Sequence, residues 1–356
     1  MRFINPSRLF TNHGLLDLDL FRIKSNSECE VFLRQNANTS DQPLYIIRQD
    51  GAGRGMFSLV LSVVFHIHYA KQYGLLPIVD FTAANSEYAD HDFMQVDLLN
   101  RCNPWDFYFE PVSPALYNSD FSSKTVLEST YAFPRRYPHW ISRISDLREI
   151  TKDYIRLAAD LVDEMQKARD FVFQGQRVLG VHFRGKEMRV APLHPLPPTT
   201  DQMFEAIERA VREYDFDRIF VVSENSELVS VILKRFPGMG VTLPQFRTSS
   251  GINSYRINPR PMHKYLLGKE ILIDALVLSE CQGLIGSISN VTEFARCYNK
   301  VGYDIDLVID NGLNSSRPLF AKHLWQLKAS LPARWGGFLV IQSSLFLVMS
   351  KDRECE

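Results

Sequence analysis

The chain has 356 residues, 45% of them apolar, which is enough for two ordinary domains that each have a core. A formal charge of -1 gives no basic excess to recruit duplex nucleic acid or an anionic membrane. We therefore expect no nucleic-acid partner, at most peripheral membrane contact, and only a local site for any anion. The five cysteines include no Cys-x-x-Cys pair and the first residues show no secretory signal, which together predict reduced thiols and a cytoplasmic location.

The first half of the chain begins with a predicted βαβ unit. It comprises a strand over residues 44–48, a glycine-rich loop, a long apolar helix over residues 56–72 and a strand over residues 76–81. Prolines and aromatic residues then interrupt the pattern over residues 88–140. We interpret that stretch as irregular structure packed on the first domain.

The second half carries the clearest series of elements. After a long amphipathic helix over residues 145–171, strands and helices alternate, which predicts a parallel, doubly wound sheet. The predicted strands are residues 177–183, 218–223 and 283–286, and the predicted helices are residues 201–214, 226–236, 264–280 and 290–298.

These patterns divide the chain into an N-terminal α/β domain over residues 1–145 and a C-terminal α/β domain over residues 146–356 that ends in a helix and a tail. We expect the two Rossmann-like domains to face one another across a cleft, with ligands at the carboxyl ends of the strands. The apolar tail over residues 336–349 is shorter than the ~20 residues of a membrane-spanning helix. A strand is favoured there over an interfacial anchor.

Polar residues follow the first strand of the second series. The stretch HFRGKE places His182, Arg184, Gly185 and Glu187 at its carboxyl end. Arginine suits a diphosphate because its planar fork donates two parallel hydrogen bonds, glycine lets the backbone approach closely, and histidine can donate or accept at a sugar or base. The alternative carries about equal weight: an Arg184–Glu187 surface ion pair with His182 in the core.

A second cluster lies further along the chain. Asp274 falls within an apolar helix and needs a partner, for which the amide edge of a guanine is one candidate. Ser287, Ser289 and Asn290 precede or open the next helix, where backbone N–H groups and hydroxyls form an anion site without a metal. Ser289 or Asn290 could equally be only an N-cap.

Together these stretches resemble the fucosyltransferase superfamily that includes the nodulation, core α1,6 and protein O-fucosyltransferases. Its His-x-Arg-Gly-Thr-Asp-Lys motif is matched by residues 182–188 (HFRGKEM), and its strand ending in Thr-Asp by FVVSENSELV. Its helix, strand and Ser-Ser/Asn block is matched by GKEILIDALVLSECQGLIGSISNVTEF, and its N-terminal glycine loop by GAGRGMF. The likeness runs in order through most of residues 44–299.

The resemblance implies a GT-B-like α/β fold and an inverting, metal-independent glycosyltransferase of carbohydrate biosynthesis. It would move a sugar, fucose in the first instance, from a GDP-sugar donor to a carbohydrate or glycoconjugate acceptor, without a cofactor. Arg184 would hold the diphosphate and act in catalysis, and Glu187 is the first candidate for the general base, with Asp50 and His194 behind it. The implied donor-binding residues are Gly51, Gly53, Gly55, His182, Arg184, Gly185, Glu224, Asp274, Ser287, Ser289 and Asn290.

The sequence departs from the family motif in two places. Lys186, Glu187 and Met188 replace Thr-Asp-Lys, and Ser223-Glu224-Asn225 stands where some members have Thr-Asp-Asp. These changes keep two alternatives open, a nucleotide-sugar-binding protein that has lost catalysis and a GT-B transferase with a different donor sugar.

Two other patterns are given structural interpretations. Metal-dependent transferases of another fold class place Asp-x-Asp at the carboxyl end of a strand, whereas two of the pairs here precede strands, so the pairs are interpreted as solvated turns. Trp105 and Tyr108 are interpreted as core residues, in preference to residues that stack on an acceptor sugar. The Asp-x-Asp pairs are Asp17/Asp19, Asp215/Asp217 and Asp304/Asp306.

Overall fold

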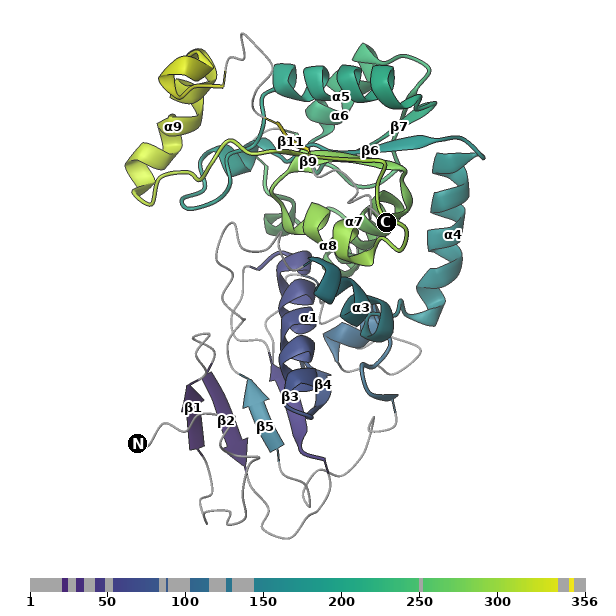
Figure 1. Ribbon diagram of the computed structural model, residues 1–356, viewed down its shortest axis with the longest axis vertical. Coiled ribbons are helices and arrows are strands. Elements are labelled where there is room, and N and C mark those ends of the chain that lie inside the picture. Colours follow the sequence, from purple (N-terminus) through teal and green to yellow (C-terminus); the bar gives the residue numbers. More distant parts are fainter. Residues whose placement is uncertain are drawn as a thin grey trace, which may run out of the picture. The chain divides into compact units, whose positions relative to one another are not determined.

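The computed structural model describes residues 21–24, 30–34, 42–48, 54–82, 88, 103–114, 126–129, 144–249, 252–338 and 346–348. The chain divides into two compact units, one of Met1–Val162 with Arg260–Lys269 and one of Asp163–Pro259 with Glu270–Glu356. Each unit combines a sheet with helices (Figure 1). The predicted α/β class is therefore confirmed, while the domain boundary after residue 145 and the cleft stay predictions.

The first unit contains the predicted βαβ element. Strands β3 (Leu44–Arg48) and β4 (Leu76–Asp80) pair in parallel, and α1 (Met56–Gln72) connects them. The full sheet order is β1-β2-β5-β3-β4, in which β5 is parallel to β3 and antiparallel to β2, and β1 is antiparallel to β2. The strands that the sequence analysis missed here are β1 (Phe21–Lys24), β2 (Glu30–Arg34) and β5 (Val126–Ser129).

Helix α1 is buried on most of its faces, which is why its sequence is apolar all round and not amphipathic. The hydroxyl of Tyr45 on β3 lies 2.8 Å from Nδ1 of His66 on α1, a buried hydrogen bond that fixes the helix against the strand. Nearby, Trp105 and Tyr108 are each only 3% exposed. Their interpretation as core residues is confirmed.

The predicted single helix over residues 145–171 is wrong. The chain instead forms α3 (Ile144–Tyr154) and α4 (Ala159–Phe173), separated by an extended link. The link forms backbone hydrogen bonds with the segment around Phe109: Glu110 N donates to Arg156 O at 2.9 Å, and Ala158 N donates to Tyr108 O at 2.9 Å. The amphipathic spacing continues across the link, but these long-range hydrogen bonds hold its backbone out of the helix.

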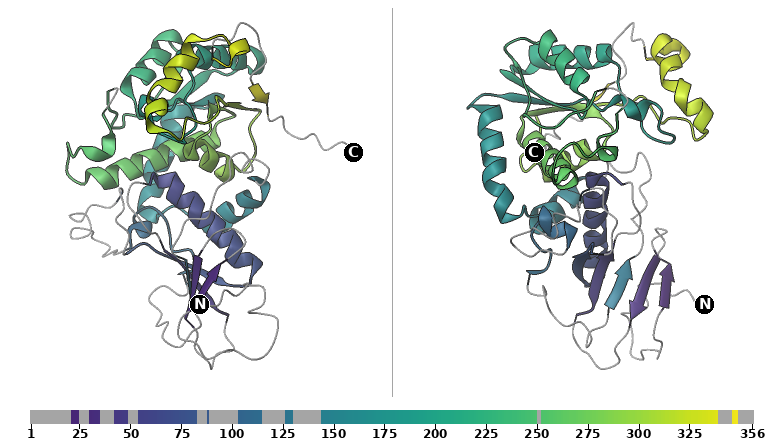
Figure 2. Two further views of the ribbon diagram at one scale, coloured as in Figure 1. Left: turned by 90° about the vertical axis from the view of Figure 1, so that its left-hand side faces the viewer. Right: turned by 180° about the vertical axis from the view of Figure 1, so that it is seen from behind.

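The second unit is built on a six-stranded sheet in the order β11-β10-β9-β6-β7-β8. All neighbouring strands are parallel except β10 and β11. Figures 1 and 2 show α5 and α6 on one face of this sheet and α7 and α8 on the other. The strands are β6 (Val178–His182), β7 (Arg218–Val222), β8 (Gly240–Val241), β9 (Gly283–Ser287), β10 (Ile305–Ile309) and β11 (Phe346–Val348), and the helices are α5 (Thr200–Tyr214), α6 (Ser226–Arg235), α7 (His263–Glu280), α8 (Asn290–Tyr298) and α9 (Pro318–Ser330).

Alternation along β6 assigns its side chains to the two faces. Leu179, Val181 and Phe183 join an apolar cluster with α5 and α6. Gly180 points the other way, where a Cβ would lie 2.8 Å from the side chain of Leu278 on α7. Since successive strand residues alternate, His182 shares the α7 face with Gly180.

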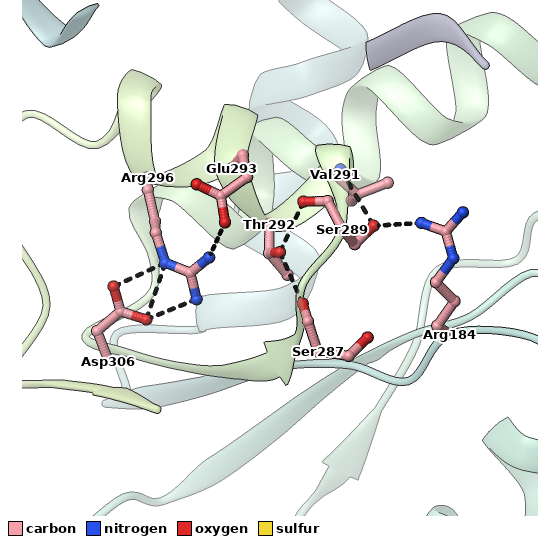
Figure 3. A network of polar contacts seen from close by, with 8 residues as sticks. All are labelled: Arg184, Ser287, Ser289, Val291, Thr292, Glu293, Arg296 and Asp306. Carbon is pink, nitrogen blue, oxygen red and sulfur yellow. Dashed lines mark hydrogen bonds and ion pairs between the residues drawn. The ribbon is translucent and has the colours of Figure 1, made fainter. Parts of the chain in front are cut away.

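A buried ion cluster joins α8 to β10. Arg296, which is 1% exposed, donates from Nε to Asp306 Oδ2 at 2.8 Å and from Nη1 to Glu293 Oε1 at 2.8 Å (Figure 3). Burial alone lowers the pKa of Arg296, but the two carboxylates outweigh it and the net shift is upward. The interpretation of Asp304/Asp306 as a solvated turn is therefore wrong for Asp306, which lies within a buried strand.

Part of the apolar tail forms a short strand, β11. Residues Phe346–Val348 pair antiparallel with β10, in agreement with the predicted strand. Across the ranges that the structure describes, none of the helices combines the length and apolar character needed to cross a bilayer.

We predict that Asp306→Ala destabilises the chain by about 3–5 kcal/mol, because it leaves the Arg296 guanidinium buried without its main counter-charge. Urea unfolding followed by circular dichroism measures the change. The matched control is Glu208→Ala, which removes a surface ion pair with Arg235 and should cost at most ~1 kcal/mol. Equal losses in the two variants would contradict the structural role of Arg296.

Candidate functional site

The candidate site lies at the carboxyl edge of the second sheet, where the direction of chain progression reverses. From β6 the chain proceeds through α5 to β7 on one side, and it later returns through α7 to β9 on the other side. His182 is in register with Val222 of β7 and with Gly286 of β9. Residues that follow the three strands therefore emerge together at a topological switch point, the usual ligand position in such sheets.

Arg184 and Ser289 bridge the switch point. The Nη1 atom of Arg184 donates to Ser289 Oγ at 2.7 Å, joining the segment after β6 to the start of α8 (Figure 3). The guanidinium contacts the helix start, and no salt bridge joins it to Glu187 among the described residues, so the alternative of an Arg184–Glu187 ion pair is not met. This one bond uses one of the five N–H donors of an arginine.

The start of α8 is shaped by hydroxyl groups. Ser289 Oγ is the N-cap and accepts from Val291 N at 3.3 Å. Thr292 Oγ1 donates to the carbonyls of Ser287 and Ser289, at 3.1 and 2.9 Å. Ser289 is thus both the N-cap and the partner of Arg184, which confirms the N-cap role, while its role in an anion site stays a prediction. A capped helix N-terminus beside a guanidinium favours a bound anion.

His182 is held as a neutral imidazole. It is 6% exposed, and burial, Arg184 and Arg296 together lower its pKa to about 3. Its Nδ1 atom is buried and has no hydrogen-bond partner among the residues that the structure describes. A neutral ring can donate from one nitrogen and accept at the other, which suits recognition of a polar ligand group.

Asp274 is a second buried polar group with spare capacity. It is 3% exposed, and its Oδ1 has no hydrogen-bond partner in the described part of the chain. Burial raises its pKa to about 7, with Arg247 opposing, Glu270 adding to the rise and a hydrogen bond from Gln245 opposing it. Arg247 in turn donates to three backbone carbonyls and to Thr242 Oγ1, which fixes the loop after β8 around Asp274.

His182 and Asp274 face the same layer of the second unit. Gly180 of β6 packs against Leu278 of α7, and helices of a parallel sheet run opposite to its strands. Asp274, one turn before Leu278, is therefore displaced along α7 toward the edge at which β6 ends in His182. Both carry buried polar atoms that the protein leaves without partners, which is uncommon enough in folded proteins to indicate a ligand or water.

Glu187 and Glu224 form a carboxyl pair. Burial, a hydrogen bond to Glu187 and the charge of Glu187 raise the pKa of Glu224 to about 8, against the opposing charge of Arg184. The Oε1 atom of Glu187 is buried and has no hydrogen-bond partner among the described residues. The raised pKa means that Glu224 keeps its proton to a higher pH than a free glutamate does.

Gly185 provides the room for this pair. A Cβ at position 185 would collide with the carboxylate oxygens of Glu187, although the backbone φ of -64° is open to any residue. The space that sequence reasoning assigned to an approaching ligand is therefore occupied by the carboxylate of Glu187.

The remaining predicted residues fall in three places. Ser287 ends β9 with its Oγ buried and unpartnered, Asn290 opens α8, and His194 lies close enough to Arg184 that its charge, after burial, lowers the pKa of His194. Gly55 is in the first unit at the start of α1. Asp50, Gly51 and Gly53 lie outside the described residues.

Two functional residues were missed from sequence, Arg247 and Arg296. Arg247 lies in a loop without a motif, and its partners are carbonyl groups that leave no signature in the sequence. Glu293 and Arg296 have the i,i+3 spacing of a helical ion pair, which was available as a signal, but Asp306 is remote along the chain.

Within the described ranges, no group of three or more His, Cys, Asp or Glu side chains is arranged to hold a metal ion. The expectation of a metal-independent site stays a prediction.

No protein-family model matches the sequence, and no curated protein matches it. Among solved structures, the chain is similar to the fucosyltransferase NodZ from Bradyrhizobium, at 15% identity and a TM-score of 0.48 over 78% of this chain and 100% of that one. It is also similar to FUT1 from Arabidopsis thaliana in complex with GDP, at 9% identity and a TM-score of 0.42 over 76% and 71% of the two chains. A third is POFUT1 in complex with GDP, at 12% and 0.40 over 74% and 97%.

We predict that Glu224→Gln stabilises the chain at high pH only. The folded-state pKa of about 8 lies above the ordinary 4.5, so the stability contributed by the proton is complete below pH 4.5 and is lost as the pH rises through 8. Glutamine keeps a donor to Glu187 and cannot ionise. Thermal unfolding should give equal Tm values at about pH 5 and a variant more stable by about 1–2 kcal/mol at about pH 9.

The control for this experiment is Glu213→Gln on the exposed side of α5, which should follow the wild-type curve at both pH values. A Glu224→Gln curve parallel to the wild type across the whole range would show that the pKa of Glu224 is not raised.

Proposed function

We propose that this chain is an inverting, metal-independent glycosyltransferase that uses a GDP-sugar donor, with fucose as the first candidate sugar. The observation that carries the proposal is the grouping of Arg184, the capped start of α8 and the buried unpartnered atoms of His182 and Asp274 at one sheet edge. A diphosphate and a nucleobase are chemically suited to the two halves of that grouping.

The diphosphate half consists of Arg184 and the N-terminus of α8. The guanidinium and the helix start both favour negative charge, and they are fixed to one another by the hydrogen bond to Ser289. A nucleoside diphosphate becomes a better leaving group when fixed donors neutralise the charge that develops on it. The arrangement would supply that stabilisation without reorganising during the reaction.

The nucleoside half consists of His182 and Asp274. The N–H groups of guanine are donors that a carboxylate accepts. One of them would donate to Oδ1 of Asp274, the buried oxygen that lacks a partner. Guanine binding would also lower the pKa of Asp274 from about 7, since hydrogen bonds to the ionised form favour it. A uracil offers no comparable pair of donors, so this half supports GDP over UDP.

The general base is assigned to Glu187. In an inverting transfer, the bond from the acceptor oxygen to the anomeric carbon forms while the bond from that carbon to the phosphate oxygen breaks. The acceptor proton would pass to Glu187, and GDP would leave with its charge held by Arg184. Glu224 positions the base by donating its own proton to Glu187.

We predict that Arg184→Ala lowers turnover of GDP-fucose by about 10³-fold, because one fixed donor to a developing charge is worth roughly that much. Release of GDP is measured with and without acceptor sugars, and Tm is measured with GDP and UDP. Arg209→Ala, on the surface of α5, is the matched control and should keep wild-type turnover. Activity within about tenfold of the wild type would remove Arg184 from the mechanism.

A second variant separates binding from catalysis. Asp274→Asn should lose the preference for GDP over UDP in the thermal-shift assay and keep the unfolding cooperativity of the wild type.

The wild-type chain itself separates the two candidate functions. If it is stabilised by GDP and neither hydrolyses nor transfers the sugar, the alternative of a nucleotide-sugar-binding protein replaces the transferase.

We predict that chelation leaves turnover unchanged, because Arg184 and the start of α8 supply the positive charge that a metal ion would otherwise provide. Turnover is measured before and after treatment with EDTA. Loss of activity that Mn²⁺ or Mg²⁺ restores would contradict the metal-independent mechanism.

A further inference from the structure

Exposed apolar side chains gather on one part of the second unit. Among the described residues, five of the six large apolar side chains that are more than half exposed lie there, the sixth being Val301. We call this set, together with the adjacent Leu313, the α9 surface. It consists of Leu193 (63% exposed), Leu313 (41%), Leu319 (77%), Phe320 (62%), Leu327 (56%) and Trp335 (66%).

Helix α9 has an inner and an outer side. Ala321 is fully buried and Trp325 is partly buried one turn later, so these residues mark the inner side. Phe320 and Leu327 are seven residues apart and therefore lie along one outer stripe, with Leu319 beside it. Figure 2 shows α9, in yellow, at the margin of the second unit.

The segments that carry the α9 surface are tied together by hydrogen bonds. Leu193 N donates to Ser315 O at 3.3 Å, and Pro195 forms an antiparallel bridge with Leu313. Asn314 Nδ2 donates to the carbonyls of Arg189, Ala191 and Ala321, at 3.0 to 3.1 Å, which joins both loops to α9. The exposed side chains thus belong to one fixed structure and not to separate loose loops.

Leu193 is held in a conformation that leucine rarely adopts. Its φ is 59°, in the left-handed region that favours glycine or asparagine, while its side chain is 63% exposed. Folding alone gains nothing from a leucine that is both strained and hydrated. A role for its apolar side chain outside the folded core accounts for the residue.

The sequence around the α9 surface is basic. Residues 311–338 contain Arg317, Lys322, Lys328 and Arg334 and no Asp or Glu, in a chain whose formal charge is -1. Arg317 and Lys322 are exposed on or next to the first turn of α9, beside Leu319 and Phe320. Outward aromatic and leucine side chains interleaved with cations are the composition of helices that lie in the headgroup region of an anionic bilayer.

We propose that the α9 surface docks on an anionic lipid bilayer, with Leu319, Phe320 and Leu327 inserted at the headgroup boundary and the exposed cations Arg317 and Lys322 on the lipid phosphates. The contact lies at the membrane surface and does not cross the bilayer. The η5 turn (Lys186–Arg189) follows Arg184 and stacks on α9, with the Arg189 guanidinium carbon 3.5 Å from the Trp325 ring centroid. Docking would therefore hold the candidate site near substrates that reside in or on the membrane.

The test uses the full chain and vesicles of phosphatidylcholine with about 30% phosphatidylglycerol, compared with vesicles of phosphatidylcholine alone. Co-sedimentation gives the partition coefficient, and neither donor nor turnover is needed, so the result is independent of the proposed function. We expect binding to the anionic vesicles that is at least tenfold stronger than to the neutral ones and that weakens with added salt.

Three variants examine the separate contributions. Leu319→Ser/Phe320→Ser should lower binding at least tenfold, and Lys322→Glu should lower it about fivefold or more. Leu193→Asn should lower it while keeping or raising Tm, because asparagine tolerates the left-handed backbone. The matched controls are Phe171→Ser, an exposed aromatic on α4, and Lys167→Glu on the same helix, which should bind as the wild type does.

Several results would overturn the proposal. One is equal binding to neutral and anionic vesicles, and another is no binding to either kind. A third is wild-type binding by both Leu193→Asn and Leu319→Ser/Phe320→Ser. A concentration-dependent dimer in sedimentation, abolished by Leu319→Ser/Phe320→Ser and unaccompanied by vesicle binding, would instead assign the α9 surface to a second copy of the chain.

Discussion

The ion cluster of Arg296 is the constraint on which the candidate site depends. By joining α8 to Asp306 of β10, it fixes the helix whose first turn carries Ser289, about two turns earlier. Ser289 in turn holds Arg184 at 2.7 Å. The same buried positive charge contributes to keeping His182 neutral. Arg296 therefore fixes the position of the helix start and adds to the effects of burial and Arg184, which keep His182 neutral.

The polar groups of the site are satisfied unevenly. Arg247 and Arg296 use their donors on carbonyls and carboxylates of the fold, whereas His182, Asp274 and Ser287 each keep a buried atom without a partner. The arginines hold the loops and helices of the fold in place, and the three unpartnered atoms are free to bind a ligand. Folded proteins tolerate few buried polar atoms of the second kind, and the three at this sheet edge are available to a ligand or to water.

Local pattern was sufficient for elements that apolar spacing and turn residues mark along the chain. The bounds of α1 and α8 agree with the sequence, and β3 and β4 agree to within one residue. Prediction failed where distant partners decide: the link between α3 and α4 pairs with the segment around Phe109, and β10 contains Asp306, whose burial depends on Arg296. The sequence analysis singled out His182, Arg184 and Ser289 because a parallel sheet brings such strand ends together, whereas the raised pKa of Glu224 follows from its burial beside Glu187, which requires coordinates.

Gly185 has a further meaning for how the segment after β6 tolerates change. Its backbone is ordinary, so an alanine would fit the chain itself without strain, yet the added carbon would stand where the Glu187 carboxylate now lies. A substitution at this position would therefore act by displacing the Glu187 side chain and would not strain the backbone. The room left by an absent methyl group thus fixes the place of an acid two residues further on.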